Sequence, residues 1–187
     1  AERMVKLPVI VYNRDKQWEV LIDTIDLRRN LEKRADAEYQ KTGKYIRPIA
    51  LLQAQPKGKE DAATFEKLRD ELKNAGIPAE HIAIRTADVN ELKDVDLLSP
   101  ECPVRYIITV NALKEGWDCP FAYILASLAN KTSQVDVEQI LGRILRLPHT
   151  CQHTQPALNM SYVLTSSADF NDTVQRIVKG LNNAGFS

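Results

Sequence analysis

The chain has 187 residues, which fit one ordinary domain, or one domain with an arm, whereas two full domains would be cramped. Lysine and arginine total 25, as do aspartate and glutamate, so the formal net charge is zero and a uniformly basic polynucleotide-coating protein is excluded. Hydrophobic residues make up 44% and charged residues 27%, which is ordinary globular usage and argues against disorder.

The cysteines and the apolar segments indicate the compartment. Three cysteines, Cys102, Cys119 and Cys151, are too few and too irregularly spaced for a disulfide framework. The least charged stretch, residues 119–130, is much shorter than the roughly 20 apolar residues that cross a bilayer. We therefore predict a reducing, cytoplasmic setting and no membrane partner. The chain begins without methionine and ends just after a helical pattern, so we expect a piece of a longer protein.

The first predicted elements are a strand and a long helix. Residues 5–12 are apolar and β-branched, which predicts a strand or extended arm, and Pro8 favours an edge position for it. Residues 16–42 repeat apolar positions at helical spacing, and Gly43 predicts the helix end. We interpret this amphipathic helix as a linker between lobes.

Strands and helices then alternate to the end of the chain. Strands are predicted at residues 46–54, 82–85, 104–110, 121–127 and 158–164. Helices are predicted at residues 61–75, 134–147 and 169–184, with a weak acidic helical turn at 89–93. Such alternation implies a mostly parallel sheet covered on both faces, whose ligands bind at the carboxyl ends of the strands. This rule indicates the loop after Gln53, residues 111–120, and the segment leading into the 134–147 helix.

The segment 133–148 has the most informative pattern. Ser133 and Asp136 resemble a capping box, which predicts a helix start. A helical projection groups four residues within an arc of about 100°: Gln139, Gly142, Arg143 and Arg146. Guanidinium groups suit phosphate, and the glycine between them lets a bulky polyanion approach the helix. By composition alone, an amphipathic helix with solvated arginines is the alternative.

Two motifs give the chain a family resemblance. Gln139-x-x-Gly142-Arg143-x-x-Arg146 has the form of motif VI of superfamily 2 helicases, and residues 107–120 (IITVNALKEGWDCP) resemble their motif V. The Glu-Gly-Trp-Asp-x-Pro form is most similar to the Res subunit of type III restriction enzymes. Residues 5–10 and 49–53, the latter in the position of motif IV, are also similar to that family. The resemblance covers most of the chain and implies the second RecA-like motor lobe, an α/β three-layer sandwich of the P-loop NTPase type with a mostly parallel sheet.

The resemblance implies a role for each motif VI position. Arg146 would be the arginine finger that reaches the γ-phosphate of ATP held on the other lobe, with Arg143 assisting at the same phosphates. In phosphoryl-transfer enzymes such a finger contributes roughly 10³–10⁵ in rate. Gln139 would position water or phosphate, and Gly142 would keep the approach open.

Motif V would add contacts to both nucleotide and nucleic acid. Gly116 would supply a turn that a side chain would obstruct. Asp118 would accept hydrogen bonds from ribose hydroxyls or from the motif VI arginines. Thr109 and Asn111 would touch a nucleic-acid backbone. Trp117 is interpreted as a packing residue of the loop.

The chain has no Gly-x-x-x-x-Gly-Lys-Ser/Thr phosphate loop. By the resemblance, ATP and Mg²⁺ would therefore be held mainly by a first lobe outside this sequence, and this piece alone would be inactive. Residues 1–44 would be an arm and linker helix from that lobe, and residues 45–187 the RecA-like helicase C-terminal domain. The expected partners are ATP, double-stranded DNA, the N-terminal RecA-like lobe of the same parent chain and a modification (methyltransferase) subunit.

The implied function is ATP-dependent DNA translocation, with helicase-type motifs, coupled to an endonuclease of a restriction system. Two alternatives stay open. One is the motor lobe of another superfamily 2 enzyme, such as a type I restriction motor or a repair helicase. The other is a non-catalytic RecA-like module that binds nucleic acid or protein.

Three further patterns in the sequence are weaker. A basic cluster near the 46–54 strand is either a phosphate contact or a solvated face: Lys41, Lys44, Arg47, Lys57 and Lys59. The alternating His149, Cys151 and His153 lack the usual zinc-ligand pattern, so we predict no metal site. Cys119 is interpreted as a small packing residue rather than a nucleophile.

Overall fold

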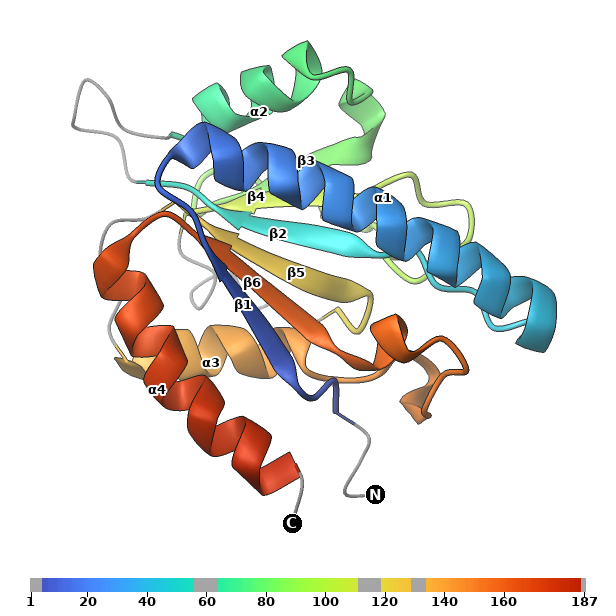
Figure 1. Cartoon of the computed structure of the whole chain (residues 1–187). Helices are drawn as coiled ribbons and strands as arrows, with labels where there is room; N and C mark the ends of the chain where they lie inside the picture. The colour runs from blue at the N-terminus through green and yellow to red at the C-terminus, as the bar shows by residue number, and fades with distance from the viewer. Residues whose placement is uncertain (1–4, 56–63, 111–118, 129–133, 186–187) are drawn as a thin grey trace.

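The computed structural model describes residues 5–55, 64–110, 119–128 and 134–185, which form an α/β sandwich (Figure 1). Six strands make one sheet: β1 (Val9–Asn13), β2 (Ile49–Gln53), β3 (Ile82–Arg85), β4 (Tyr106–Thr109), β5 (Ala122–Ser127) and β6 (Ser161–Thr165). They are ordered β1-β6-β5-β2-β4-β3, and every neighbouring pair is parallel. Every residue of β2, β4, β5 and β6 is buried. This confirms the predicted parallel sheet with both faces covered.

Helices form the two outer layers. The main helices are α1 (Gln17–Thr42), α2 (Phe65–Asn74), α3 (Gln134–Ile144) and α4 (Ala168–Gly185). Short 3₁₀ helices are η1 (Ala79–His81), η2 (Pro148–Thr150) and η3 (Pro156–Asn159). Figure 1 shows α1 and α2 on one face of the sheet and α3 and α4 on the other. The α1 helix packs on β2, β5 and β6, whereas α3 packs on β5 and α4 on β1.

The N-terminal elements belong to the sandwich. β1 pairs only with β6 in the described sheet and is an edge strand, as Pro8 predicted. The α1 helix ends at Gly43, whose left-handed backbone (φ 75°) suits glycine and whose N–H donates to Tyr39 O at 2.8 Å. The helix has 26 residues and is about 39 Å long, about twice the length of a six-residue strand. Tyr39, near its end, fits the helical pattern but is exposed, and the centre of its ring lies 6.2 Å from that of Tyr45. The domain division at residue 44 stays a prediction.

The predicted helical turn at residues 89–93 is wrong. The segment forms a turn closed by an isolated antiparallel bridge between Arg85 and Asn90. Main-chain groups of this segment bind β3 and the residue after it instead of one another: Glu91 N–H donates to Ile84 O at 2.9 Å, and Val89 O accepts from Thr86 N–H at 2.7 Å. Side chains support the turn, because Glu91 Oε1 accepts from Ile84 N–H and Thr86 Oγ1 accepts from Val89 N–H.

None of the helices within the described ranges is long and apolar enough to cross a membrane.

Candidate nucleotide and nucleic-acid site

The motif VI helix, α3, has one face in the core and one in solvent. Three apolar side chains are buried against the sheet layer: Ile140, Leu141 and Ile144. Gln139 and Gly142 are exposed on the opposite side. The two-faced helix is therefore confirmed for these residues. The side chain of Arg143 lies outside the described ones.

The predicted extension of this helix to residue 147 is wrong, and so is the projection that puts Arg146 on it. The helix ends at Ile144. Beyond it, Leu145 O accepts a hydrogen bond from Lys6 N–H at 2.5 Å, and Arg146 forms an isolated antiparallel bridge with Val5. Pro148 also disfavours helical backbone at the residue before it. Arg146 is exposed just past the helix end.

The contacts of Lys6 give the direction of α3. Its Nζ donates to Ala122 O, at the start of β5, and to Ile144 O, at the end of α3. The end of α3 therefore lies beside the start of β5, so α3 runs antiparallel to this strand. Arg146 consequently lies near the amino edge of the sheet.

The opposite, carboxyl edge of the sheet is a row of polar residues. The last residue of every strand is polar, and the register of the strands aligns these residues: Asn13, Thr165, Ser127, Gln53, Thr109 and Arg85. We call these six residues the carboxyl-edge row. Tyr162 and Tyr106 lie three residues before the ends of β6 and β4, and both side chains point toward α1. Tyr162 lines a pocket with α1, and the hydroxyl of Tyr106 accepts a hydrogen bond from Arg28 of α1. Since side chains alternate along a strand, the row faces the α3 and α4 layer instead.

Two members of the carboxyl-edge row have unsatisfied polar atoms. Gln53 Oε1 and Ser127 Oγ are buried without a hydrogen-bond partner among the described residues. Buried polar atoms without partners are rare, and a catalytic role or a bound ion is among their explanations. The sequence predicted a ligand site at the loop after Gln53 but not at Ser127 or Thr165. A signal for both was present, because the last residue of each predicted strand, or a residue next to it, is polar.

The structure therefore separates the predicted site residues. Thr109, the predicted nucleic-acid contact, is 0% exposed at the end of β4 in the carboxyl-edge row, so this structure contradicts a direct contact of its side chain with nucleic acid. Arg146, the predicted ATP contact, lies toward the amino edge, and Gln139 and Gly142 lie between them along α3. The remaining motif V positions, Asn111, Gly116, Trp117 and Asp118, lie outside the described residues.

The basic cluster was interpreted as either a phosphate contact or a solvated face. Arg47 fits neither interpretation, because it is 2% exposed. Three main-chain oxygens accept from its guanidinium group: those of Val104, Ser99 and Leu97. Its cationic carbon also lies 5.8 Å from the centre of the Phe121 ring. Arg47 is thus a structural cation that satisfies buried carbonyls. Of the others, Lys41 and Lys44 are exposed, and Lys57 and Lys59 lie outside the described residues.

The side chains of His149 and His153 bind main-chain oxygens. His149 Nε2 lies 2.6 Å from Tyr45 O, and His153 Nε2 lies 3.0 Å from Pro148 O. In the part of the chain that the structure describes, no three His, Cys, Asp or Glu side chains are grouped to hold a metal ion. Burial raises the pKa of Cys119 to about 11, which keeps its thiol protonated and agrees with a packing role.

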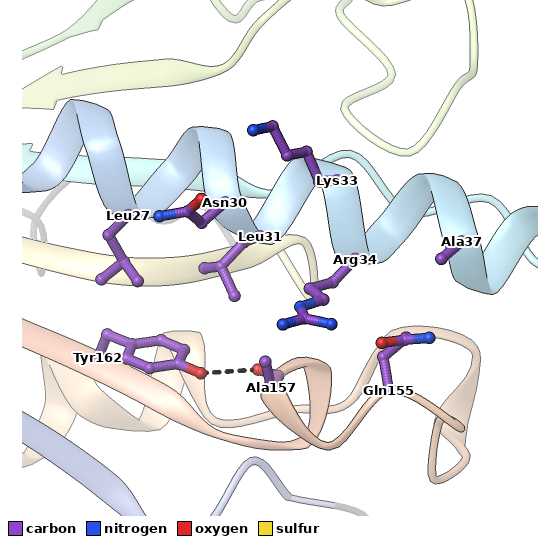
Figure 2. Close-up of a pocket in the computed structure, with 9 residues that line it drawn as sticks. All are labelled: Leu27, Asn30, Leu31, Lys33, Arg34, Ala37, Gln155, Ala157 and Tyr162. Atoms are coloured by element: carbon purple, nitrogen blue, oxygen red, sulfur yellow. Dashed lines mark hydrogen bonds between the residues drawn. The ribbon is translucent and has the colours of Figure 1, made fainter.

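A pocket of about 610 Å³ lies away from α3, between α1, η3 and β6 (Figure 2). Leu27, Leu31 and Tyr162 form apolar walls, and Arg34 extends toward Ala157 across the opening in Figure 2. Tyr162 donates to Ala157 O at 2.9 Å. None of the predicted site residues lines this pocket.

Acidification is expected to destabilise the fold in two stages. Burial lowers the pKa of His153 below its usual 6.5, although Pro148 O and Glu38 favour the proton. The unfolded chain therefore binds this proton first, and stability falls as pH drops from about 6.5 toward the folded pKa. Burial alone would raise the pKa of Glu38, but hydrogen bonds from Thr154 and Gln155 hold it below 4.5. Its contribution is present above about pH 4.5 and is lost as pH falls through the folded pKa.

Urea midpoints measured between about pH 8 and about pH 3 test this prediction. His153→Phe is expected to reduce the loss between about pH 6.5 and pH 5 and to keep most of the later loss, which becomes somewhat smaller because His153 helps to lower the pKa of Glu38. A smaller early loss remains, because burial and Arg105 also lower the pKa of His81. A variant whose midpoints follow the wild-type profile above pH 5 would show that His153 is not responsible.

Comparison with known proteins gives matches by structure alone. No protein-family model and no curated protein matches the sequence. Domain 2 of the DEAD-box helicase Mss116p, bound to an RNA duplex, has a TM-score of 0.55 and 13% identity, covering 93% of this chain and 59% of that one. The C-terminal domain of a Dbp5 variant from S. cerevisiae, bound to a Gle1 variant and IP6, has a TM-score of 0.50 and 15% identity, covering 92% and 83%.

A third match is the ATP-dependent type ISP restriction-modification enzyme LlaBIII bound to DNA. Its TM-score is 0.45 at 19% identity, and the alignment covers 96% of this chain and 14% of that one. The chain thus spans 59% of the matched Mss116p chain and a much smaller part of LlaBIII. By its parallel six-stranded sheet and its match to helicase domain 2, this chain has the RecA-like α/β fold.

Proposed function

We propose that the chain is the second motor lobe of an ATP-dependent nucleic-acid translocase of superfamily 2, and specifically of a type III restriction enzyme Res subunit acting on double-stranded DNA. The observation that carries this proposal is α3, which presents Gln139 and Gly142 to solvent on a RecA-like sheet, with Arg146 exposed just past its end. The match to helicase domain 2 supports the coarser part of the proposal, and the motif V sequence supports the Res subunit.

The open side of α3 fits a nucleotide phosphate chain. A Cβ built on Gly142 meets no heavy atom within 4 Å, so the described residues leave the space beside it open. ATP with Mg²⁺, held mainly by the other lobe, supplies the phosphoanhydride bond that is cleaved. Arg146 then provides positive charge where negative charge develops in the transition state, and Gln139 orients the attacking water.

The separation of the carboxyl edge of the sheet from Arg146 suits a motor lobe. Because the Thr109 side chain is buried, the nucleic-acid contacts at this edge are assigned to residues that follow the strands, and β5 and α3, which pack together, join this edge to the nucleotide contacts toward the amino edge. A rigid unit of this kind moves both contacts at once when the cleft between lobes closes and opens. In the proposed restriction enzyme, an endonuclease domain and a methyltransferase subunit complete the system.

ATP hydrolysis by a protein that holds both lobes tests the proposal. We expect double-stranded DNA to stimulate turnover. Stimulation by RNA alone would contradict the DNA translocase, and no turnover in the presence of either nucleic acid would favour a non-catalytic binding module.

Gly142→Ala is expected to raise stability and lower activity. Gly142 is helical and open, so alanine should stabilise the fold by about 0.5 kcal/mol through helix propensity. The added methyl occupies the space proposed for phosphate, and we expect kcat/KM for ATP to fall by about tenfold or more. Urea unfolding and steady-state ATP hydrolysis measure the two effects.

Gly180→Ala in α4 is the matched control, since Gly180 is also helical with nothing within 4 Å of an added Cβ. It should gain stability to a similar extent and keep full activity. Equal activity of the two variants would remove Gly142 from the proposed nucleotide contact.

A further inference from the structure

Residues 5–7 form a segment that leads into β1 and holds the end of α3; we call it the strap. Lys6 N–H donates to Leu145 O at 2.5 Å, and Val5 forms the bridge with Arg146. On the other side, Ser161 Oγ at the start of β6 donates to Lys6 O at 2.9 Å. The strap is therefore held between the end of α3 and the start of β6, at the amino edge of the sheet.

The side chain of Lys6 adds a second attachment to the same place. It is 0% exposed, and its Nζ donates to Ala122 O at 2.7 Å and to Ile144 O. The ammonium group also lies 4.5 Å from the centre of the Tyr123 ring. The last carbonyls of a helix lack partners within the helix and carry partial negative charge. Lys6 thus caps α3 from a segment more than a hundred residues away in sequence.

The two carbonyls that Lys6 binds at this end belong to Ile144 and Leu145, which directly precede Arg146. Without the ammonium group and its hydrogen bonds, the last turn of α3 has no such partner and the main chain at Arg146 is less constrained. A displacement of about 1 Å at a reacting centre costs about a hundredfold in rate. The position of Arg146 is therefore sensitive to the strap.

We propose that Lys6 is a positioning residue for Arg146, an inference that rests on the proposed role of Arg146 in ATP hydrolysis. Lys6 touches no nucleotide and acts through the end of α3. In the proposed two-lobed protein, a movement of the preceding lobe would pull on the strap, and the strap would pass this movement to Arg146 through Lys6. The strap is then a mechanical connection between lobe movement and the arginine.

Hydrogen exchange in this chain tests the structural part of the proposal without any activity. The informative amide is that of Leu145, which donates to Leu141 O at 3.1 Å in the last turn of α3. In Lys6→Met we expect it to exchange about tenfold faster or more relative to amides of β5. Arg47→Met is the matched control, because it also removes a buried cation from main-chain carbonyls but does not touch α3. Equal acceleration at Leu145 in both variants would overturn the positioning role.

ATP hydrolysis by the two-lobed protein tests the functional part. At a temperature at which both variants are folded, we expect Lys6→Met to lower kcat by about tenfold or more with little change in KM for ATP, and Arg47→Met to leave kcat near wild type. In an Arg146→Ala background, Lys6→Met should have no further effect, because its action passes through Arg146. The same loss in both backgrounds would overturn the proposal.

Ser161→Ala is a milder variant for use where Lys6→Met does not fold. It removes the hydrogen bond to Lys6 O and leaves the ammonium contacts in place. A smaller kcat loss that disappears with Arg146→Ala supports the proposal, and an unchanged kcat contradicts it. Faster exchange at Leu145 combined with a wild-type rate for Arg146→Ala would show instead that the strap holds α3 and that the proposed function is wrong.

Discussion

Arg146→Ala in a protein that holds both lobes is expected to lower kcat for ATP hydrolysis by about 10³-fold or more. The guanidinium group is proposed to neutralise charge that develops on the transferred phosphoryl group, and no other described side chain at the end of α3 is an exposed cation. The loss should appear mainly in kcat, because the interaction is strongest in the transition state. Steady-state hydrolysis at saturating ATP and double-stranded DNA measures it.

The controls separate this loss from unfolding. Arg146 is exposed, and interactions of exposed charged side chains contribute little, so alanine should change the free energy of unfolding by about 1 kcal/mol or less. Arg176, an exposed arginine on α4, is the matched position, and Arg176→Ala should keep wild-type turnover. Near wild-type turnover in Arg146→Ala would contradict the assignment of Arg146 as the arginine finger.

Lys6→Met should lower the free energy of unfolding by about 3 kcal/mol. Methionine fills similar space but donates no hydrogen bond, so Ala122 O and Ile144 O lose a buried donor. Each buried carbonyl left without a partner costs about 1–3 kcal/mol, and the favourable contact of the ammonium with Tyr123 is lost as well. Urea unfolding followed by circular dichroism measures the shift in midpoint.

Lys44→Met is the control for the same chemical change on the surface, since Lys44 is exposed. It should change the free energy of unfolding by about 0.5 kcal/mol or less. Indistinguishable midpoints for the two variants would mean that the carbonyls at the end of α3 find other partners. Both large effects therefore arise at one place, where α3 ends beside the strap.

Local patterns determined much of the fold in advance. The alternation of strands and helices was enough to predict a parallel sheet with two helical layers, and Pro8 was enough to predict an edge strand. Gly43 correctly marked the end of α1, because a left-handed cap is a property of a few adjacent residues. The apolar positions of α3 likewise showed which face enters the core.

The wrong predictions have two physical causes. Some residues contact others that are distant in the sequence, and some main-chain groups bind side chains instead of helix partners. Residues 145–147 fit a helical period, but the strap offers their backbone other partners. Arg47 looked like a surface cation because the carbonyls it binds lie about 50 residues or more along the chain. Lys6 gave no sign of burial, since a lysine is expected at the surface unless its donors are satisfied.

The sequence by itself determined the class of fold, the face of α3 that packs on the sheet, and the motif residues that carry the resemblance. These depend on hydrophobic periodicity and on spacing within one segment. Only the tertiary structure decided where the helix ends, which cations are buried and that Thr109 and Arg146 lie toward opposite edges of the sheet. These depend on contacts between carbonyl groups and strands that are far apart in the sequence, and no local sequence pattern predicts such contacts.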